Sequence, residues 1–168
     1  IGMGRIGSAV ARRAQGFGMR VLYHNRTPLA PDQANGATWV DKNTLLSEAD
    51  HLILVVPYSA QTHHLIGAAE LAQMKPSAVL VNIARGGVVD DVALAHALAK
   101  GQIAAAGIDV FENEPAIAPE LLAAPNAVLT PHIGSATKAT RLGMVNVAVA
   151  NLLDWHAGQR MRNLIHIS

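Results

Sequence analysis

Cysteine, charge and long apolar runs are scarce in this sequence, and each shortage excludes a class of protein. The absence of Cys from the 168 residues excludes a disulfide framework and a thiolate metal site. Charged residues make up only 15%, the formal net charge is +1, and no run of Lys or Arg stands out, so we expect neither nucleic acid nor a membrane as partner. No apolar run approaches the roughly 20 residues of a membrane span. With no Cys and no visible signal peptide, we expect a cytoplasmic protein.

The glycines that are present form a motif at the start of the chain. Gly2, Gly4 and Gly7 have the spacing G-x-G-x-x-G. In this motif the first Gly allows a tight turn, the second lets the backbone approach a pyrophosphate, and the third lets helix and strand pack closely. The motif alone is weak, but here it opens a helix whose N-terminal N–H groups would face the anion. It therefore favours a dinucleotide-binding turn.

Only Ile1 precedes this turn, although a turn of this type normally follows a strand. We therefore expect the chain to be a fragment whose sheet lacks most of its first, central strand. Apolar residues make up 51% of the sequence, which fits a globular domain with much buried surface.

Short apolar runs alternate with helical stretches along the rest of the chain. The pattern predicts strands at 19–24, 37–40, 51–57, 78–84, 104–111 and 127–130, and helices at 5–16, 42–49, 67–74, 90–101 and, as one long amphipathic helix, 136–157. The runs LILVV and AVLVNI do not alternate, which is typical of strands buried on both faces of a parallel sheet. We predict an α/β fold over residues 1–157, a Rossmann-type doubly wound parallel sheet with helices on both faces. Residues 158–168 lack a clear period and lead elsewhere.

Residues 25–27 stand where NAD-binding domains of this fold carry an acidic residue for the ribose 2′-hydroxyl. The chain has Asn25, Arg26 and Thr27 there. A carboxylate would repel a 2′-phosphate, whereas an Arg guanidinium would bind it. The stretch predicts that NADP(H) is preferred and that NAD(H) is possible. The alternative is an exposed turn before Pro28 with an incidental Arg.

Three stretches at the ends of predicted strands carry residues suited to hydride transfer, namely Arg85, Glu114 and His132. The carboxyl ends of parallel strands share one edge, so we expect these residues to converge there. An Arg can hold a substrate carboxylate, a His can protonate a forming alkoxide, and a carboxylate keeps the imidazole charged. Each residue alone has a structural explanation, but together they favour reduction of a 2-oxo acid.

No metal site is expected from the spacing of the remaining His residues. His63 and His64 are adjacent and lack the i, i+4 spacing that places two ligands on one helix face. We treat them as structural or surface residues.

The segments GMGRIG, VNIARGGVVD, AAGIDVFENEP and LTPHIGSAT resemble those of the D-isomer-specific 2-hydroxyacid dehydrogenases over almost the whole chain. HNRT and PHIGSATKATRLGM are most similar to the NADPH-dependent glyoxylate/hydroxypyruvate reductase branch, which includes 2-ketogluconate reductases. The resemblance implies reduction of a small 2-oxo acid to the D-2-hydroxy acid. In it, Arg85 binds substrate and His132, paired with Glu114, is the acid/base. It also implies cofactor contacts from Arg5 and Ile6 at the pyrophosphate, Val56, Pro57 and Thr62 on the adenine side, Asp109 at the carboxamide, and Ile83, Ala84 and Gly134 beside the nicotinamide.

Members of this family are longer than this chain, so the resemblance implies a substrate domain that is absent here and to which residues 158–168 lead back. It implies a homodimer through the cofactor domain, and a fragment that is inactive alone. An NAD-dependent relative of the phosphoglycerate or D-lactate type is the nearest alternative. A corepressor similar to the C-terminal-binding proteins is another, and the Asn-Arg-Thr stretch argues against it. Formate dehydrogenase is disfavoured, because that branch has Gln where this chain has Glu114.

Overall fold

The computed structural model describes residues 1–164, which fall into two compact units. Unit 1 comprises residues 1–131 and unit 2 begins at His132. The predicted domain boundary after residue 157 therefore lies inside unit 2, and it stays a prediction. Residues 165–168 of the predicted tail lie outside the described residues.

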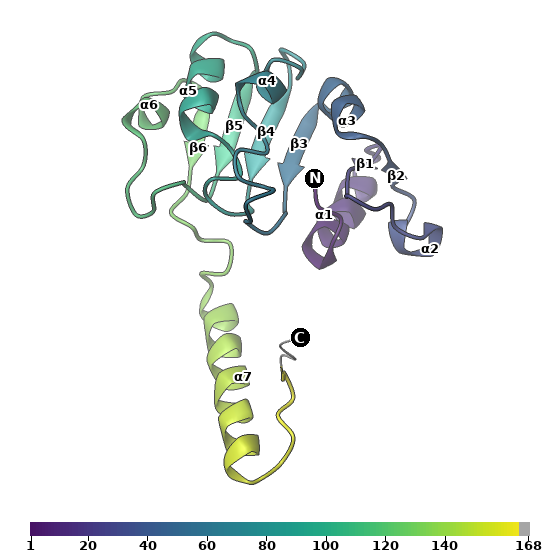
Figure 1. Ribbon diagram of the computed structural model, residues 1–168, viewed down its shortest axis with the longest axis vertical. Helices are drawn as coiled ribbons and strands as arrows, with labels where there is room; N and C mark the ends of the chain where they lie inside the picture. Colours follow the sequence, from purple (N-terminus) through teal and green to yellow (C-terminus); the bar gives the residue numbers. More distant parts are fainter. Residues whose placement is uncertain (165–168) are drawn as a thin grey trace. The chain divides into compact units, whose positions relative to one another are not determined.

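Unit 1 alternates strands and helices in the predicted order (Figure 1). Its strands are β1 (Leu22–Tyr23), β2 (Thr38–Trp39), β3 (His51–Leu54), β4 (Val79–Asn82), β5 (Ala105–Ile108) and β6 (Ala127–Leu129). Its helices are α1 (Arg5–Gly16), α2 (Pro31–Ala34), α3 (Lys42–Glu48), α4 (Ala68–Leu71), α5 (Asp91–Ala99) and α6 (Pro119–Leu122). Helices α2 and α6 were not predicted. Both begin with a Pro, whose fixed φ suits the first turn of a helix.

All strand pairs in unit 1 are parallel. One sheet has the order β3-β4-β5-β6, and β1 pairs with β2 in a second sheet. The register places Leu80 beside Leu52 and Ala106 beside Leu80. Parallel strands separated by helices confirm the predicted α/β, Rossmann-type fold.

The central strands are buried on one face and only partly buried on the other. Leu52, Leu54 and Leu80 are at most 1% exposed, whereas their neighbours Ile53 and Val81 are partly exposed. The prediction of burial on both faces is therefore wrong for this chain. The reason is local, because Ile53 and Val81 line a cavity.

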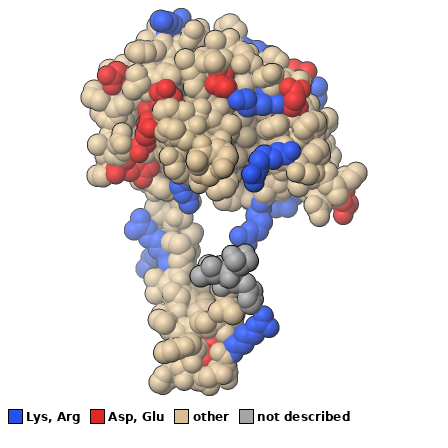
Figure 2. Space-filling view, in the orientation of Figure 1, with Lys and Arg blue, Asp and Glu red and all other residues tan. Residues whose placement is uncertain are grey.

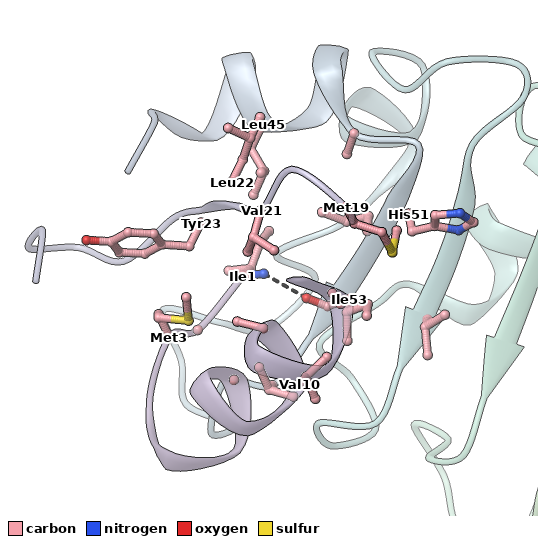
Figure 3. A pocket seen from close by; sticks show the side chains of 18 of the residues that line it. Ile1, Met3, Val10, Met19, Val21, Leu22, Tyr23, Leu45, His51 and Ile53 are labelled. Atoms are coloured by element: carbon pink, nitrogen blue, oxygen red, sulfur yellow. Dashed lines mark hydrogen bonds between the residues drawn. The ribbon is translucent and has the colours of Figure 1, made fainter. Parts of the chain in front are cut away.

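That cavity, of about 600 Å³, is lined by residues of β1, β3, α1 and α3 (Figure 3).

The first two residues of the chain form hydrogen bonds to the segments of β1 and β3. The Ile1 amino group donates to the Ile53 carbonyl at 2.7 Å, Val55 N–H donates to the Ile1 carbonyl at 3.0 Å, and Gly2 N–H donates to the His24 carbonyl at 3.0 Å. Residues 1–2 thus make the bonds of a strand between β1 and β3, where the sequence led us to expect a central strand. That the chain is a fragment stays a prediction.

Side-chain caps set the starts of several helices. Asp41 accepts a backbone N–H in the first turn of α3, and Asp90 accepts two in the first turn of α5. Thr137 does the same for α7 (Lys138–His156), the long helix of unit 2. These caps satisfy N–H groups that a helix leaves without intrahelical partners.

Helix α7 carries exposed apolar side chains on more than one side. Leu142 and Val145 lie on one side, whereas Met144 and Val147 lie roughly opposite them around the helix axis, and all four are at least half exposed. The expectation of an amphipathic helix is therefore wrong, and the pattern is typical of a helix covered on several sides. No helix within residues 1–164 has the length and apolarity needed to cross a membrane.

Figure 2 shows acidic and basic side chains of unit 1 interspersed on the face in view.

Gly7 and Gly16 of α1 differ in how closely the rest of the chain approaches them. A Cβ on Gly7 would overlap the carbonyl oxygen of Gly2, whereas one on Gly16 meets nothing within 4 Å. We predict that Gly7→Ala lowers the free energy of unfolding by about 1–3 kcal/mol, because the helix must shift. Gly16→Ala should leave stability unchanged or raise it by up to about 1 kcal/mol. Urea denaturation followed by circular dichroism measures both, and equal stability of the two variants would contradict the packing argument.

Candidate functional site

The glycine turn presents an uncapped helix N-terminus to solvent. Gly2 has φ +95, and Gly4 is the N-cap of α1 with nothing within 4 Å of its Cβ position. No side chain caps α1, and no acidic residue lies in its first turn. Arg5 and Ile6 in that turn are exposed. The backbone N–H groups and the positive end of the helix dipole can therefore receive a phosphate.

Asn25 ties the loop after β1 to the glycine turn. Its Oδ1 accepts the Met3 N–H at 2.7 Å, and its carbonyl accepts the Trp39 indole N–H at 3.0 Å. Arg26 and Thr27 follow and are exposed. Asn25 thus positions this loop, a role not predicted from the sequence. The contribution of Trp39 was also missed, because a single Trp in a short strand forms no motif.

The loop after β3 packs against the same turn. Val56 Cγ1 lies 2.9 Å from the Cβ position of Gly2, so the two are in direct contact. Thr62 donates its hydroxyl to the Pro57 carbonyl and accepts the Ser59 N–H, each at 2.8 Å. The three residues predicted on the adenine side, Val56, Pro57 and Thr62, therefore belong to one internally bonded loop.

The end of β4 sets the position of Arg85. Asn82 is fully buried, and its Oδ1 accepts the Ala84 N–H at 3.1 Å. The Arg85 guanidinium donates to the Ala84 carbonyl at 2.6 Å. The Ala84 side chain lies in the hydrophobic core, so only its backbone can face a ligand, whereas Ile83 is 40% exposed.

The loops that carry Arg85 and Glu114 meet backbone to backbone. A Cβ on Gly86 would overlap the Phe111 carbonyl, so only Gly fits at this position. Glu114 turns back toward its own loop, and its Oε1 accepts the Phe111 N–H at 2.9 Å. The structure therefore brings the loops of these two predicted catalytic residues together at one edge of the sheet.

Asp109 links the ends of three neighbouring strands. It follows β5, its side chain is 8% exposed, and its N–H donates to the Asn82 carbonyl at 3.0 Å. The Thr130 hydroxyl, just after β6, donates to Asp109 Oδ1 at 2.6 Å. Neither Thr130 nor Asn82 was predicted as a site residue, although their places directly at the ends of β6 and β4 were a usable signal.

His132 and Gly134, the remaining predicted site residues, belong to unit 2, and His132 has a left-handed backbone with φ 52. Non-glycine residues adopt this conformation rarely. Arg85 and Glu114 belong to unit 1. The predicted pairing of His132 with Glu114 therefore stays a prediction.

Comparison with known proteins identifies relatives of the whole chain. Residues 1–134 match the family described as D-isomer specific 2-hydroxyacid dehydrogenase, NAD binding domain. Glyoxylate reductase from Thermococcus litoralis is 49% identical over 168 residues, which cover 99% of this chain and 50% of that protein. Glyoxylate/hydroxypyruvate reductase B from Pectobacterium atrosepticum is 52% identical over 169 residues, 99% of this chain and 53% of that protein.

Among solved structures, an NADPH-dependent glyoxylate/hydroxypyruvate reductase from Sinorhizobium meliloti, in complex with NADP and malonate, has a TM-score of 0.91 and 40% identity. The match covers 98% of this chain and 51% of that chain. This chain therefore spans about half the length of the relatives it matches.

The hydrogen bond from Thr130 to Asp109 is expected to stabilise the fold. Thr130→Val keeps the shape of the side chain but removes the donor to a buried carboxylate, so we expect a loss of about 2 kcal/mol in the free energy of unfolding. Thr38→Val, at an exposed position of β2, is the control and should change stability by less than about 0.5 kcal/mol. Urea denaturation of both variants measures the difference, and equal values would show that the Thr130–Asp109 bond contributes nothing.

Proposed function

This chain belongs to the D-isomer specific 2-hydroxyacid dehydrogenases as their NAD-binding domain, and on that premise we propose that it serves the reduction of a small 2-oxo acid by NADPH. The substrate is of the glyoxylate or hydroxypyruvate type and the product is the D-2-hydroxy acid. The observation that carries the proposal is the edge of the sheet where β4, β5 and β6 end. Arg85 follows β4, Asp109 and Glu114 follow β5, and Thr130 after β6 donates a hydrogen bond to Asp109, so the loops at this edge contact one another.

The described residues fit a dinucleotide. The Gly4 position is open, and the first turn of α1 has neither a side-chain cap nor an acidic residue to compete with a pyrophosphate. The buried Asp109 carboxylate at the end of β5 suits the carboxamide that the resemblance assigns to it. When bound, the nicotinamide supplies the hydride that reduces C2 of the substrate.

The residues of the chain bind the substrate and move the proton. Arg85 binds the substrate carboxylate, and because an Arg has five N–H donors, its bond to Ala84 is compatible with a bidentate grip. His132 donates the proton to the forming alkoxide oxygen. Glu114 is the carboxylate that pairs with His132 in this proposal, as the resemblance implies.

The exposed loop after β1 supports a preference for NADP(H). Asn25 is neutral and held by Met3, and Arg26 beside it is exposed, so the loop offers a positive charge and no carboxylate. A relative solved with NADP supports the same choice. Bidentate guanidinium–phosphate contacts would then distinguish the 2′-phosphate from a 2′-hydroxyl.

We also propose that residues 1–157 form the cofactor domain of a longer enzyme with a separate substrate domain, and that the enzyme is a homodimer through its cofactor domains. Support comes from the half-length match to the relatives and from the many exposed apolar side chains of α7.

Cofactor binding to this chain tests the role of Arg26. We predict that Arg26→Ala weakens NADPH binding by about tenfold or more, because a charge-assisted contact contributes about 1.5–3 kcal/mol, and that NADH binding changes little. Arg13→Ala, in the last turn of α1, removes the same charge elsewhere and should leave both affinities unchanged. Nucleotide titration by calorimetry measures the affinities. Equal losses for the two nucleotides would contradict recognition of a 2′-phosphate.

Turnover of the full-length protein tests the role of His132. We predict that His132→Gln lowers kcat for glyoxylate or hydroxypyruvate by about 100-fold or more, as expected for loss of a general acid, with cofactor affinity unchanged. His156→Gln, at the end of α7, is the control and should keep full activity. Steady-state assays with NADPH decide, and unchanged turnover in His132→Gln would remove this residue from the mechanism.

A further inference from the structure

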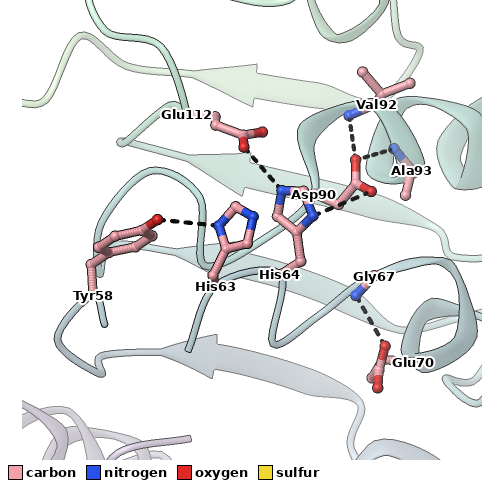
Figure 4. Close-up of polar contacts among 9 residues, drawn as sticks. All are labelled: Tyr58, His63, His64, Gly67, Glu70, Asp90, Val92, Ala93 and Glu112. Atoms are coloured by element: carbon pink, nitrogen blue, oxygen red, sulfur yellow. Dashed lines mark hydrogen bonds and ion pairs between the residues drawn. The ribbon is translucent and has the colours of Figure 1, made fainter. Parts of the chain in front are cut away.

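Two adjacent imidazoles and a carboxylate from a distant loop meet at one exposed point of unit 1 (Figure 4). His63 and His64 lie in the turn after β3, and Glu112 lies in the loop after β5. One ring nitrogen of each His and one Glu112 oxygen all lie within 4.8 Å of one another. The two rings stack with centroids 3.9 Å apart, and His64 Nε2 lies 3.0 Å from Glu112 Oε1.

Each imidazole has a second partner on its Nδ1 atom. His63 Nδ1 lies 3.2 Å from the Tyr58 hydroxyl, and His64 Nδ1 lies 3.8 Å from Asp90 Oδ2. Metal-ligating His residues characteristically bind a carboxylate or another polar group through the nitrogen that does not face the metal. His63 Nδ1 is within hydrogen-bond distance of such a group, and His64 Nδ1 faces the Asp90 carboxylate from beyond that distance, so we assign the ligand role to the Nε2 atoms.

Two further carboxylates, those of Asp90 and Asp91, lie beside the cluster. Asp91 is 3% exposed, its Oδ2 accepts the Glu112 N–H at 3.1 Å, and within residues 1–164 its Oδ1 accepts no hydrogen bond. Carboxylates beside the proposed ligands make this position electrostatically favourable for a cation.

We propose that His63, His64 and Glu112 form a binding site for a divalent transition-metal cation of the Zn²⁺ class. Two imidazoles and one carboxylate are ligands that suit Zn²⁺, Co²⁺ and Ni²⁺, and a His₂Glu set leaves a position for water. At Zn–N distances of about 2.0–2.1 Å, tetrahedral ligands lie about 3.3 Å apart. His63 and Glu112 are exposed, so their side chains can close the remaining distance.

Binding at this point ties together loops after three strands. His64 N–H donates to the Gly87 carbonyl at 2.7 Å, two residues after Arg85, and Glu112 lies two residues before Glu114. His64 is also held in a left-handed conformation with φ 47. The metal therefore stabilises the loops of the proposed catalytic residues without entering the hydride transfer, and its binding is independent of the cofactor preference.

Titration of the full chain, without a histidine tag, with Co²⁺ and Zn²⁺ tests the site. We expect one equivalent of Co²⁺ with the visible absorption of a tetrahedral ion, and one equivalent of Zn²⁺ by calorimetry. Glu112→Gln and His63→Ala should each weaken binding by at least about tenfold, and Tyr58→Phe by about tenfold as a residue that orients a ligand. His51→Ala and Glu120→Gln change an exposed His and an exposed Glu elsewhere, and should bind as the unaltered chain does.

Thermal unfolding without metal establishes that each variant is folded before it is titrated. Because Glu112→Gln and His63→Ala alter different exposed side chains, one of them remains informative if the other fails to fold. Failure of the unaltered chain to bind either ion, unaltered binding in both ligand variants, or an equal loss in His51→Ala would overturn the proposal.

Discussion

The close backbone contact between Gly86 and Phe111 is the constraint on which the candidate site depends. The loop of Arg85 and the loop of Glu114 lie so close together that no side chain fits between them at this point. Only Gly at position 86 permits this contact. The contact requires β4 and β5 to be neighbours in parallel register, which the pairing of Val79–Asn82 with Ala105–Ile108 provides. The sheet thereby fixes the positions of the loops that carry the proposed catalytic residues.

The glycine turn, the succession of strands and helices along the chain, and the loops with Arg85 and Glu114 could be predicted because each depends on local sequence. Gly2, Gly4 and Gly7 need only their own spacing, and a continuous apolar run indicates a strand wherever it occurs. Contacts between segments that are far apart in the sequence produce no recognisable local pattern. The bonds of Thr130 to Asp109 and of Asn25 to Met3 join residues more than 20 positions apart. Burial of the strands was overestimated, since the cavity beside Ile53 depends on which segments flank β3.

The cluster of His63, His64 and Glu112 also depends on a contact between distant segments, which the sequence pattern does not indicate. Spacing within the sequence argued against a metal site, because two adjacent His residues do not share a helix face. In the structure they lie in a turn, and the third ligand is 48 residues from His64. The loop after β5 therefore serves two proposed sites, with Glu112 at one and Glu114 at the other.

We propose that the carboxyl edge of this sheet binds a phosphorylated dinucleotide and aligns it with the loops of Arg85 and Glu114. A crystal structure of the chain with NADPH tests this most directly. We expect the pyrophosphate at the N-terminus of α1, the 2′-phosphate at Arg26 and the nicotinamide beside Asp109. Nucleotide density away from the glycine turn, or a nicotinamide directed away from the ends of β4 and β5, would contradict it.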